Sequence, residues 1–178
     1  PAPELRQAAP LSREQGPVSY ADAVEKAAPA VVNIYSSRVV ERDQHPLMSD
    51  PFFRQFFGDD VPARQRMLSS LGSGVIVSED GYVLTNHHVI GGADQIQVAL
   101  RDGRETLAEV IGTDPESDLA VLRIDLDELP VIELADSTEV AIGDVSLAIG
   151  NPFGVGQTVT MGIISATGRS HLGLNAYE

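Results

Sequence analysis

The sequence predicts an all-β fold, either a barrel or a sandwich. About eight short runs of β-favouring residues are separated by turns that contain glycine, and only one short segment has helical spacing. The chain has 178 residues, of which 43% are hydrophobic and 21% charged. This length and composition are typical of one globular domain, or of one domain and part of a second.

The N-terminal segment is predicted to contain an extended arm followed by one short helix. Residues 1–18 are rich in proline and polar side chains, which is typical of a poorly ordered arm. We expect a helix over about 20–28, because Ser19 is a suitable N-cap and Pro29 ends the run. The residues that recur at helical spacing are Tyr20, Val24 and Ala27.

Strand patterns follow this helix, beginning with the valine-rich run 31–40. A hairpin is predicted where the runs 75–77 and 82–84 flank the turn that ends in Asp80 and Gly81. Further strands are predicted at 96–100, 106–112, 119–124, 145–149 and 158–166.

The stretch 41–70 has no strand pattern and is predicted to be a long loop, which in a compact domain is functional or disordered. Its phenylalanines are Phe52, Phe53, Phe56 and Phe57, out of 5 in the whole chain. Two interpretations stay open. These rings could plug the core, or they could form a contact surface, because exposed phenylalanine clusters are disfavoured on monomers.

Composition excludes several classes of function. Lys and Arg number 12 against 26 Asp and Glu, and a net charge of −14 is unfavourable for binding nucleic acid. The absence of cysteine excludes disulfides, thiolate zinc sites and thiol nucleophiles. No apolar run approaches the roughly 18–20 residues that a membrane-spanning helix needs. The histidines show no zinc-binding pattern, so no metal or cofactor is predicted.

Two polar features could carry chemistry. His87 and His88 follow a predicted strand at a tight turn, where neighbouring side chains point to opposite sides, so one shared site is disfavoured. Asp118 directly precedes an apolar strand. Taken alone, each of these residues could be an ordinary surface or turn residue, whereas together an aspartate could orient a histidine for proton transfer.

Five motifs in fixed order make a more specific interpretation possible. The motifs occupy residues 72–77, 81–89, 114–122, 148–154 and 159–165. Together they resemble the HtrA (Deg) family of serine proteases, especially its DegS/AlgW-like subgroup, and the resemblance extends from about Ser19 to the last residue.

The resemblance implies a chymotrypsin-like double β-barrel. The short helix and a complete first barrel would then occupy residues 19–135, including the loop 41–70, after the flexible arm 1–18. Residues 136–178 would begin a second barrel truncated after about two strands, and the family's C-terminal PDZ domain would be absent.

The family pattern Thr-Asn-x-His-Val places the general base at His88, with His87 at the variable position. The pattern Asp-Pro-x-x-Asp-Leu-Ala places the orienting carboxylate at Asp118. The family's Gly-Asn-Ser-Gly-Gly nucleophile motif does not occur in these 178 residues. We therefore expect a fragment that lacks the nucleophilic serine and is inactive alone.

The resemblance also implies regulatory positions. Phe153 matches the aromatic position of the activation loop, Arg169 matches a residue of the sensor loop, and Tyr20 lies in the segment that forms homotrimers. Each also has a plain structural interpretation: a glycine-rich turn for Phe153, a solvated surface residue for Arg169 and a small covering helix for Tyr20.

The implied parent is a periplasmic serine endopeptidase with an inner-membrane anchor, which this chain does not include. Its expected partners are a peptide activator and, as substrate, a membrane-bound anti-sigma factor cleaved at site 1 during envelope stress. The alternative is a non-catalytic scaffold that trimerises or docks partners through the loop 41–70 and the N-terminal arm.

Overall fold

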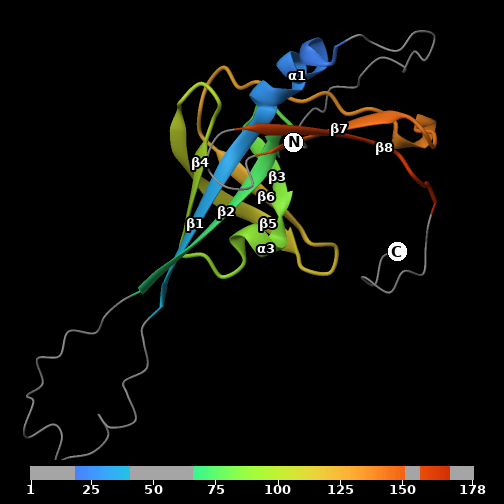
Figure 1. Cartoon of the computed structure of the whole chain (residues 1–178). Helices are drawn as coiled ribbons and strands as arrows, with labels where there is room; N and C mark the ends of the chain where they lie inside the picture. The colour runs from blue at the N-terminus through green and yellow to red at the C-terminus, as the bar shows by residue number, and fades with distance from the viewer. Residues whose placement is uncertain (1–18, 41–65, 151–156, 169–178) are drawn as a thin grey trace, which may run out of the picture.

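The structure is a computed structural model that describes residues 19–40, 66–150 and 157–168. Six strands close into a barrel, and two further strands form a separate small sheet (Figure 1). The elements in chain order are α1 (Ala21–Ala27), η1 (Ala28–Ala30), β1 (Val31–Val40), β2 (Arg66–Ile76), β3 (Tyr82–Asn86), α3 (His87–Ile90), β4 (Gln95–Ala99), β5 (Glu105–Asp114), β6 (Leu119–Ile124), η3 (Ser137–Glu139), β7 (Val145–Gly150) and β8 (Thr158–Ile163).

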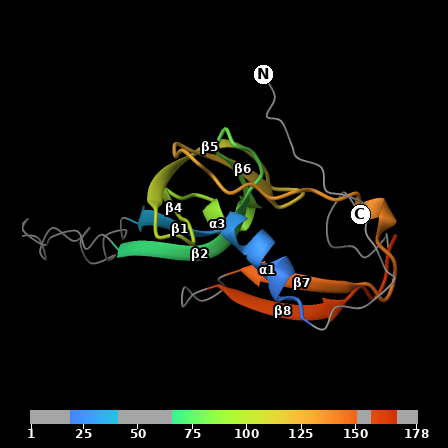
Figure 2. The same ribbon diagram turned by 90° about the horizontal axis from the view of Figure 1, so that it is seen from above.

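This architecture confirms the predicted fold class. The barrel order is β1-β2-β3-β6-β5-β4, every pairing is antiparallel, and β1 closes the barrel by pairing with both β2 and β4. The β7–β8 sheet lies to one side of this barrel (Figure 2). The result is a complete first barrel of the chymotrypsin type and, among the described residues, two strands of a second.

The barrel core follows from the alternation of side chains along the strands. In β1, Val32 and Ile34 are fully buried, whereas the intervening Asn33 and the following Tyr35 face outward. Burial of each larger apolar side chain stabilises the fold by roughly 1.5–3 kcal/mol. The core cluster comprises Val32, Ile34, Ile76, Val83, Val89, Ile90, Ile96, Val98, Leu100, Ala120, Leu122 and Ile124.

The predicted hairpin turn is present, and its glycine is required. Gly81 has φ +87, and a Cβ atom there would lie 2.1 Å from the carbonyl oxygen of Ile124. The Gly81 N–H donates to the carbonyl of Ser78 at 3.1 Å, and the Gly81 carbonyl accepts from the Ile124 N–H at 2.9 Å. The turn therefore joins β2 to β3 and also abuts the end of β6.

Two predicted boundaries were wrong. Residues 66–70, expected to belong to the loop, form the first half of β2 and pair with residues 36–40 of β1. Their sequence lacks alternation, so the pairing with β1, rather than their own pattern, makes them a strand. At the other end of the chain, β8 stops at Ile163 instead of continuing to residue 166.

The N-terminal helix is close to its predicted position but begins differently. The N-cap residue is Tyr20, which makes no side-chain capping bond, while the Ser19 hydroxyl accepts from the Ala21 N–H at 3.2 Å. Pro29 does not stop the chain's helical course at once, because it lies in the first turn of η1, where a missing N–H is tolerated. No helix of the described residues is long and apolar enough to span a bilayer.

An amide side chain next to the small sheet bonds to backbone carbonyls at the start of the barrel. Gln157 Nε2 donates to the carbonyls of Ala28 at 2.7 Å and Val31 at 2.9 Å. The sheet otherwise exposes large apolar side chains, such as Met161 and Ile163 at 65% each. Two strands alone cannot bury such a face.

Candidate active site

The pairing of β3 with β6 brings the two candidate catalytic residues together. The last pair of this ladder is Asn86 with Leu119. The chain continues from Asn86 into α3, which carries His88, and it reaches Leu119 directly from Asp118. Residues that are 30 positions apart in sequence are therefore neighbours at one end of the barrel wall.

The α3 helix is seated on the barrel by its apolar half. Val89 and Ile90 are buried in the core cluster, and the buried Ser36 hydroxyl donates to the Val89 carbonyl at 2.7 Å. This helix replaces the turn expected after β3. Because its last two residues point into the core, His88 is carried at a defined place on the surface.

His88 and Asp118 make two hydrogen bonds with each other. The His88 Nδ1 atom lies 2.6 Å from Asp118 Oδ2, and the His88 backbone N–H donates to Asp118 Oδ1 at 2.9 Å. Both carboxylate oxygens are thus engaged by one residue. The imidazole side chain is 70% exposed, so it remains accessible to a reacting group.

These bonds also favour the ionised carboxylate. The backbone N–H of His88, followed by its imidazole, holds the pKa of Asp118 below the ordinary aspartate value, against a weaker opposing effect of desolvation. An ionised Asp118 accepts hydrogen bonds only, which leaves the proton of the shared bond on His88 Nδ1. Its negative charge would stabilise a protonated imidazole.

The backbone of Asp118 is in an unusual conformation. Its φ is +54, in the left-handed region that non-glycine residues rarely occupy, at a cost of about 1–3 kcal/mol. The Asp118 carbonyl accepts from the Asn86 side-chain amide at 3.0 Å and from the His87 N–H at 3.1 Å. Asp118 is therefore held at its carbonyl by Asn86 and His87 and at its carboxylate by His88.

The turn before Asp118 is organised by Asp114. The Asp114 carboxylate accepts from the Ser117 hydroxyl at 2.7 Å and from the Glu116 N–H at 3.1 Å. These bonds hold the pKa of Asp114 below its ordinary value, and the bond from the Ser117 hydroxyl has the largest effect. An ionised Asp114 thus stabilises the short connection that leads from β5 to Asp118.

The two adjacent histidines have different surroundings. His87 is half-buried, and its Nδ1 atom is buried without a hydrogen-bond partner among the described residues. Only His88 bonds the Asp118 carboxylate through its ring. Within the described segments no group of three or more His, Cys, Asp or Glu side chains could hold a metal ion.

Of the three residues expected to have regulatory or trimer-contact roles, the structure describes Tyr20. Tyr20 is half-buried at the start of α1, where its carbonyl accepts from the Val24 N–H at 3.0 Å. Phe153, Arg169 and the phenylalanines of the loop 41–65 lie outside the described residues.

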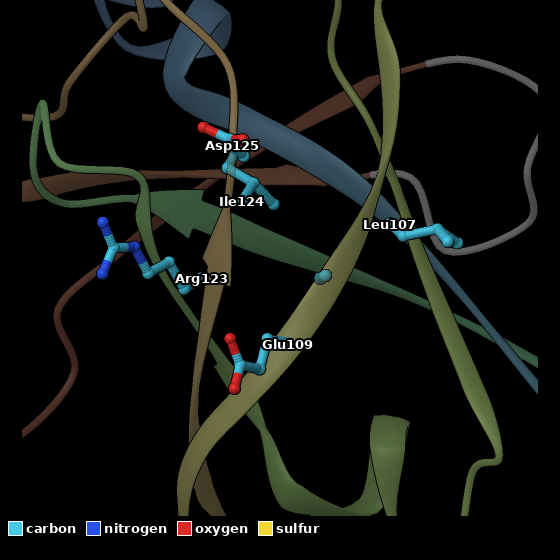
Figure 3. A pocket seen from close by; sticks show the side chains of 6 residues that line it. Leu107, Glu109, Arg123, Ile124 and Asp125 are labelled. Atoms are coloured by element: carbon cyan, nitrogen blue, oxygen red, sulfur yellow. The ribbon is translucent and has the colours of Figure 1, made fainter.

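Two cavities lie away from His88 and Asp118. One, of about 470 Å³, is an open groove between β5 and β6, and its lining includes Asp125 and the register partners Glu109 and Arg123 (Figure 3). The other, of about 350 Å³, is lined by Val31, Asn33, Leu100, Arg101 and Gln157. Neither includes a residue of the His88–Asp118 pair, which lies at an open surface.

Sequence reasoning missed two polar contacts. Asn86 occupies the Asn position of the Thr-Asn-x-His-Val motif, and its place next to the histidines is the one sequence signal that pointed to a role at the site. Gln157 bonds carbonyls that precede it by 126 and 129 residues, and no local pattern indicates such a contact.

Comparisons with known proteins agree with this geometry. The family described as trypsin-like peptidase domain matches residues 72–177, more than half of the chain. The solved structure of the HtrA-type protease AlgW with decapeptide is 64% identical and superposes with a TM-score of 0.72 over 90% of this chain and 50% of its own. The chain belongs to the HtrA family of trypsin-like peptidases.

Other proteins named as serine proteases also match this chain. A serine endoprotease structure from Yersinia pestis is 47% identical and superposes with a TM-score of 0.63 over 86% of this chain and 47% of its own. A probable periplasmic serine endoprotease, DegP-like, of a Marinomonas strain is 48% identical and covers 85% of this chain and 35% of its own length. The putative serine protease HhoA of a Synechocystis strain is 45% identical, over 96% of this chain and 44% of its own. The chain spans less than half the length of these two curated relatives.

Proposed function

We propose that this chain is the N-terminal part of the protease domain of a periplasmic serine endopeptidase. The observation that carries the proposal is the two-bond contact between His88 and Asp118 on the wall of an HtrA-type barrel. The relatives named as periplasmic serine endoproteases support both the activity and the compartment. We divide the chain into an arm (1–18), a helix with the first barrel (19–135) and the start of the second barrel (136–178).

His88 acts as the general base in this proposal. Asp118 accepts the Nδ1 proton, which fixes the tautomer and presents the unprotonated Nε2 to a serine hydroxyl. His88 takes the hydroxyl proton while the serine attacks the peptide carbonyl, and it then returns the proton to the leaving amine. Asp118 stays ionised throughout and stabilises the imidazolium.

The serine nucleophile belongs, in this proposal, to a part of the parent protein that these 178 residues do not cover. The longer relatives support this assignment, since the match to the DegP-like protein of the Marinomonas strain covers only 35% of that protein. The oxyanion hole is built from backbone N–H groups around the nucleophile. We therefore expect the 178 residues alone to be inactive.

The finer assignments follow the DegS/AlgW-like resemblance. They comprise an inner-membrane anchor, a homotrimer with Tyr20 at its contact, and cleavage of a membrane-bound anti-sigma factor in envelope stress. Phe153 and Arg169 would transmit the binding of a peptide activator. The AlgW structures with a bound decapeptide or tripeptide support peptide binding in this subgroup.

The test replaces His88 by alanine in the parent protein that carries the serine. Cleavage of an unfolded protein substrate should fall by about 10³–10⁶-fold, because the proton acceptor is lost. Thermal unfolding of the variant should differ little from that of the parent, since the imidazole is largely exposed and the backbone N–H of residue 88 can still bond Asp118. Undiminished cleavage would refute the role of His88.

A further inference from the structure

We propose that Asn86 is a positioning residue for this site: its side-chain amide holds Asp118 in the backbone conformation from which the carboxylate bonds His88. The inference rests on the proposed catalytic roles of His88 and Asp118. It assigns to Asn86 no contact with substrate and no part in proton transfer.

The first observation is that Asp118 needs an external restraint. Its φ of +54 lies in the left-handed region, which aspartate enters more often than most residues with a Cβ atom but still at an energetic cost, so contacts from outside the turn help to hold it there. The Asp118 N–H reaches the Pro115 carbonyl only at 3.4 Å, which is a long and weak hydrogen bond. The turn therefore does little to hold Asp118 through its N–H.

The second observation is that the restraint comes through the carbonyl of Asp118. This oxygen accepts from the Asn86 Nδ2 at 3.0 Å and from the His87 N–H at 3.1 Å. A carbonyl oxygen has two lone pairs, so these donors satisfy it fully. Together they fix the orientation of the peptide group that follows Asp118.

The same arrangement occurs at another strained residue. Among the described residues, Glu128 is the one other non-glycine position with positive φ, at +50. Its carbonyl accepts from the Arg104 Nη2 at 3.2 Å, a donor that lies 24 residues away. In both cases a side chain from a distant segment holds the carbonyl of a left-handed residue.

The restraint acts directly on the catalytic geometry. The carbonyl and the carboxylate belong to one residue, so holding the peptide group that follows Asp118 restricts rotation about its Cα–C bond and thereby the direction of its Cα–Cβ bond. That direction aims Oδ1 at the His88 N–H and Oδ2 at Nδ1, at 2.9 and 2.6 Å. Asn86 is suited to this task because it ends β3 opposite Leu119, the neighbour of Asp118.

The decisive variants are Asn86→Ala and Asn86→Asp in the serine-containing parent protein. The aspartate keeps the shape of the side chain but has no N–H to donate. The matched control is Gln97→Ala on β4. It removes another exposed amide donor, which bonds Glu105 Oε2 at 2.8 Å. Peptide-cleavage kinetics give kcat and KM, and carboxyl-carbon NMR follows the titration of Asp118.

Both Asn86 variants should lower kcat by up to about 10²-fold, the loss expected when catalytic groups are misplaced by about 1 Å. KM should stay unchanged, because Asn86 is assigned no substrate contact. The pKa of Asp118 should move upward in Asn86→Ala, because the bonds from His88 that lower it become longer. Gln97→Ala should change none of these quantities.

Three outcomes would overturn the proposal. They are an unchanged kcat with an unchanged Asp118 titration, a rise in KM alone, and a fall in kcat without any shift in the titration. Failure of the proposed function has a different signature. In that case His88→Ala cleaves as well as the parent, while Asn86→Ala still shifts the titration of Asp118.

Discussion

Gly72 of β2 and Val89 of α3 are in such close contact that no side chain fits between them. A Cβ atom at position 72 would lie 2.6 Å from both methyl carbons of Val89. Val89 follows His88 directly, so this contact sets how closely the helix that carries the imidazole approaches the barrel. The absence of a Cβ atom at position 72 thus helps to place His88, the proposed general base.

Gly72→Ala is therefore expected to displace α3. Overpacking of this kind costs about 1–3 kcal/mol in the free energy of unfolding, which urea denaturation measures. Cleavage by the parent protein should fall as well, because His88 moves with Val89. The control is Gly112→Ala, since nothing lies within 4 Å of a Cβ atom at that position. Equal effects of the two substitutions would contradict the role given to the close contact.

The lowered pKa of Asp118 predicts an acid-dependent contribution to stability. A carboxyl group whose pKa is lower in the folded state stabilises the protein above its unfolded-state value of about 3.9. This contribution is lost as the pH falls through the folded-state pKa.

Asp118→Asn removes the titrating group and keeps its shape, and asparagine tolerates positive φ. The difference in melting temperature between the original chain and this variant should be constant near pH 7 and should shrink below about pH 4. Other carboxyl groups with lowered pKa values, such as Asp114 and Asp136, are present in both proteins and cancel. A difference that does not depend on pH would argue against the bonds from His88 as its source.

Gln157 is expected to anchor the small sheet to the barrel. Gln157→Ala leaves the carbonyls of Ala28 and Val31 without these donors, at a cost of about 1–3 kcal/mol if water cannot replace them. Amide hydrogen exchange should become faster in β7 and β8 but not in β3 and β6. Unchanged exchange in β7 and β8 would show that other contacts hold the sheet.

The motif at His88 and the motif before Leu119 predicted a pair that the structure brings into contact. The strands 31–40 and 119–124 were also predictable, because each is a short run rich in β-favouring, apolar residues. Residues 66–70 were not, because their strand conformation depends on pairing with β1. The roles of Asn86 and Gln157 were missed since both bond to carbonyl groups that are remote in sequence.

By itself the sequence determined the class of fold, most of its strands and the residue types of the candidate site, because side-chain alternation, glycine turns and short motifs are local properties. Only the tertiary structure decided that Asp118 is left-handed, that Asn86 bonds its carbonyl and that Val89 rests on Gly72. These features depend on the register between strands and on distances of a few tenths of an ångström. Such quantities arise when segments that are remote in sequence pack together.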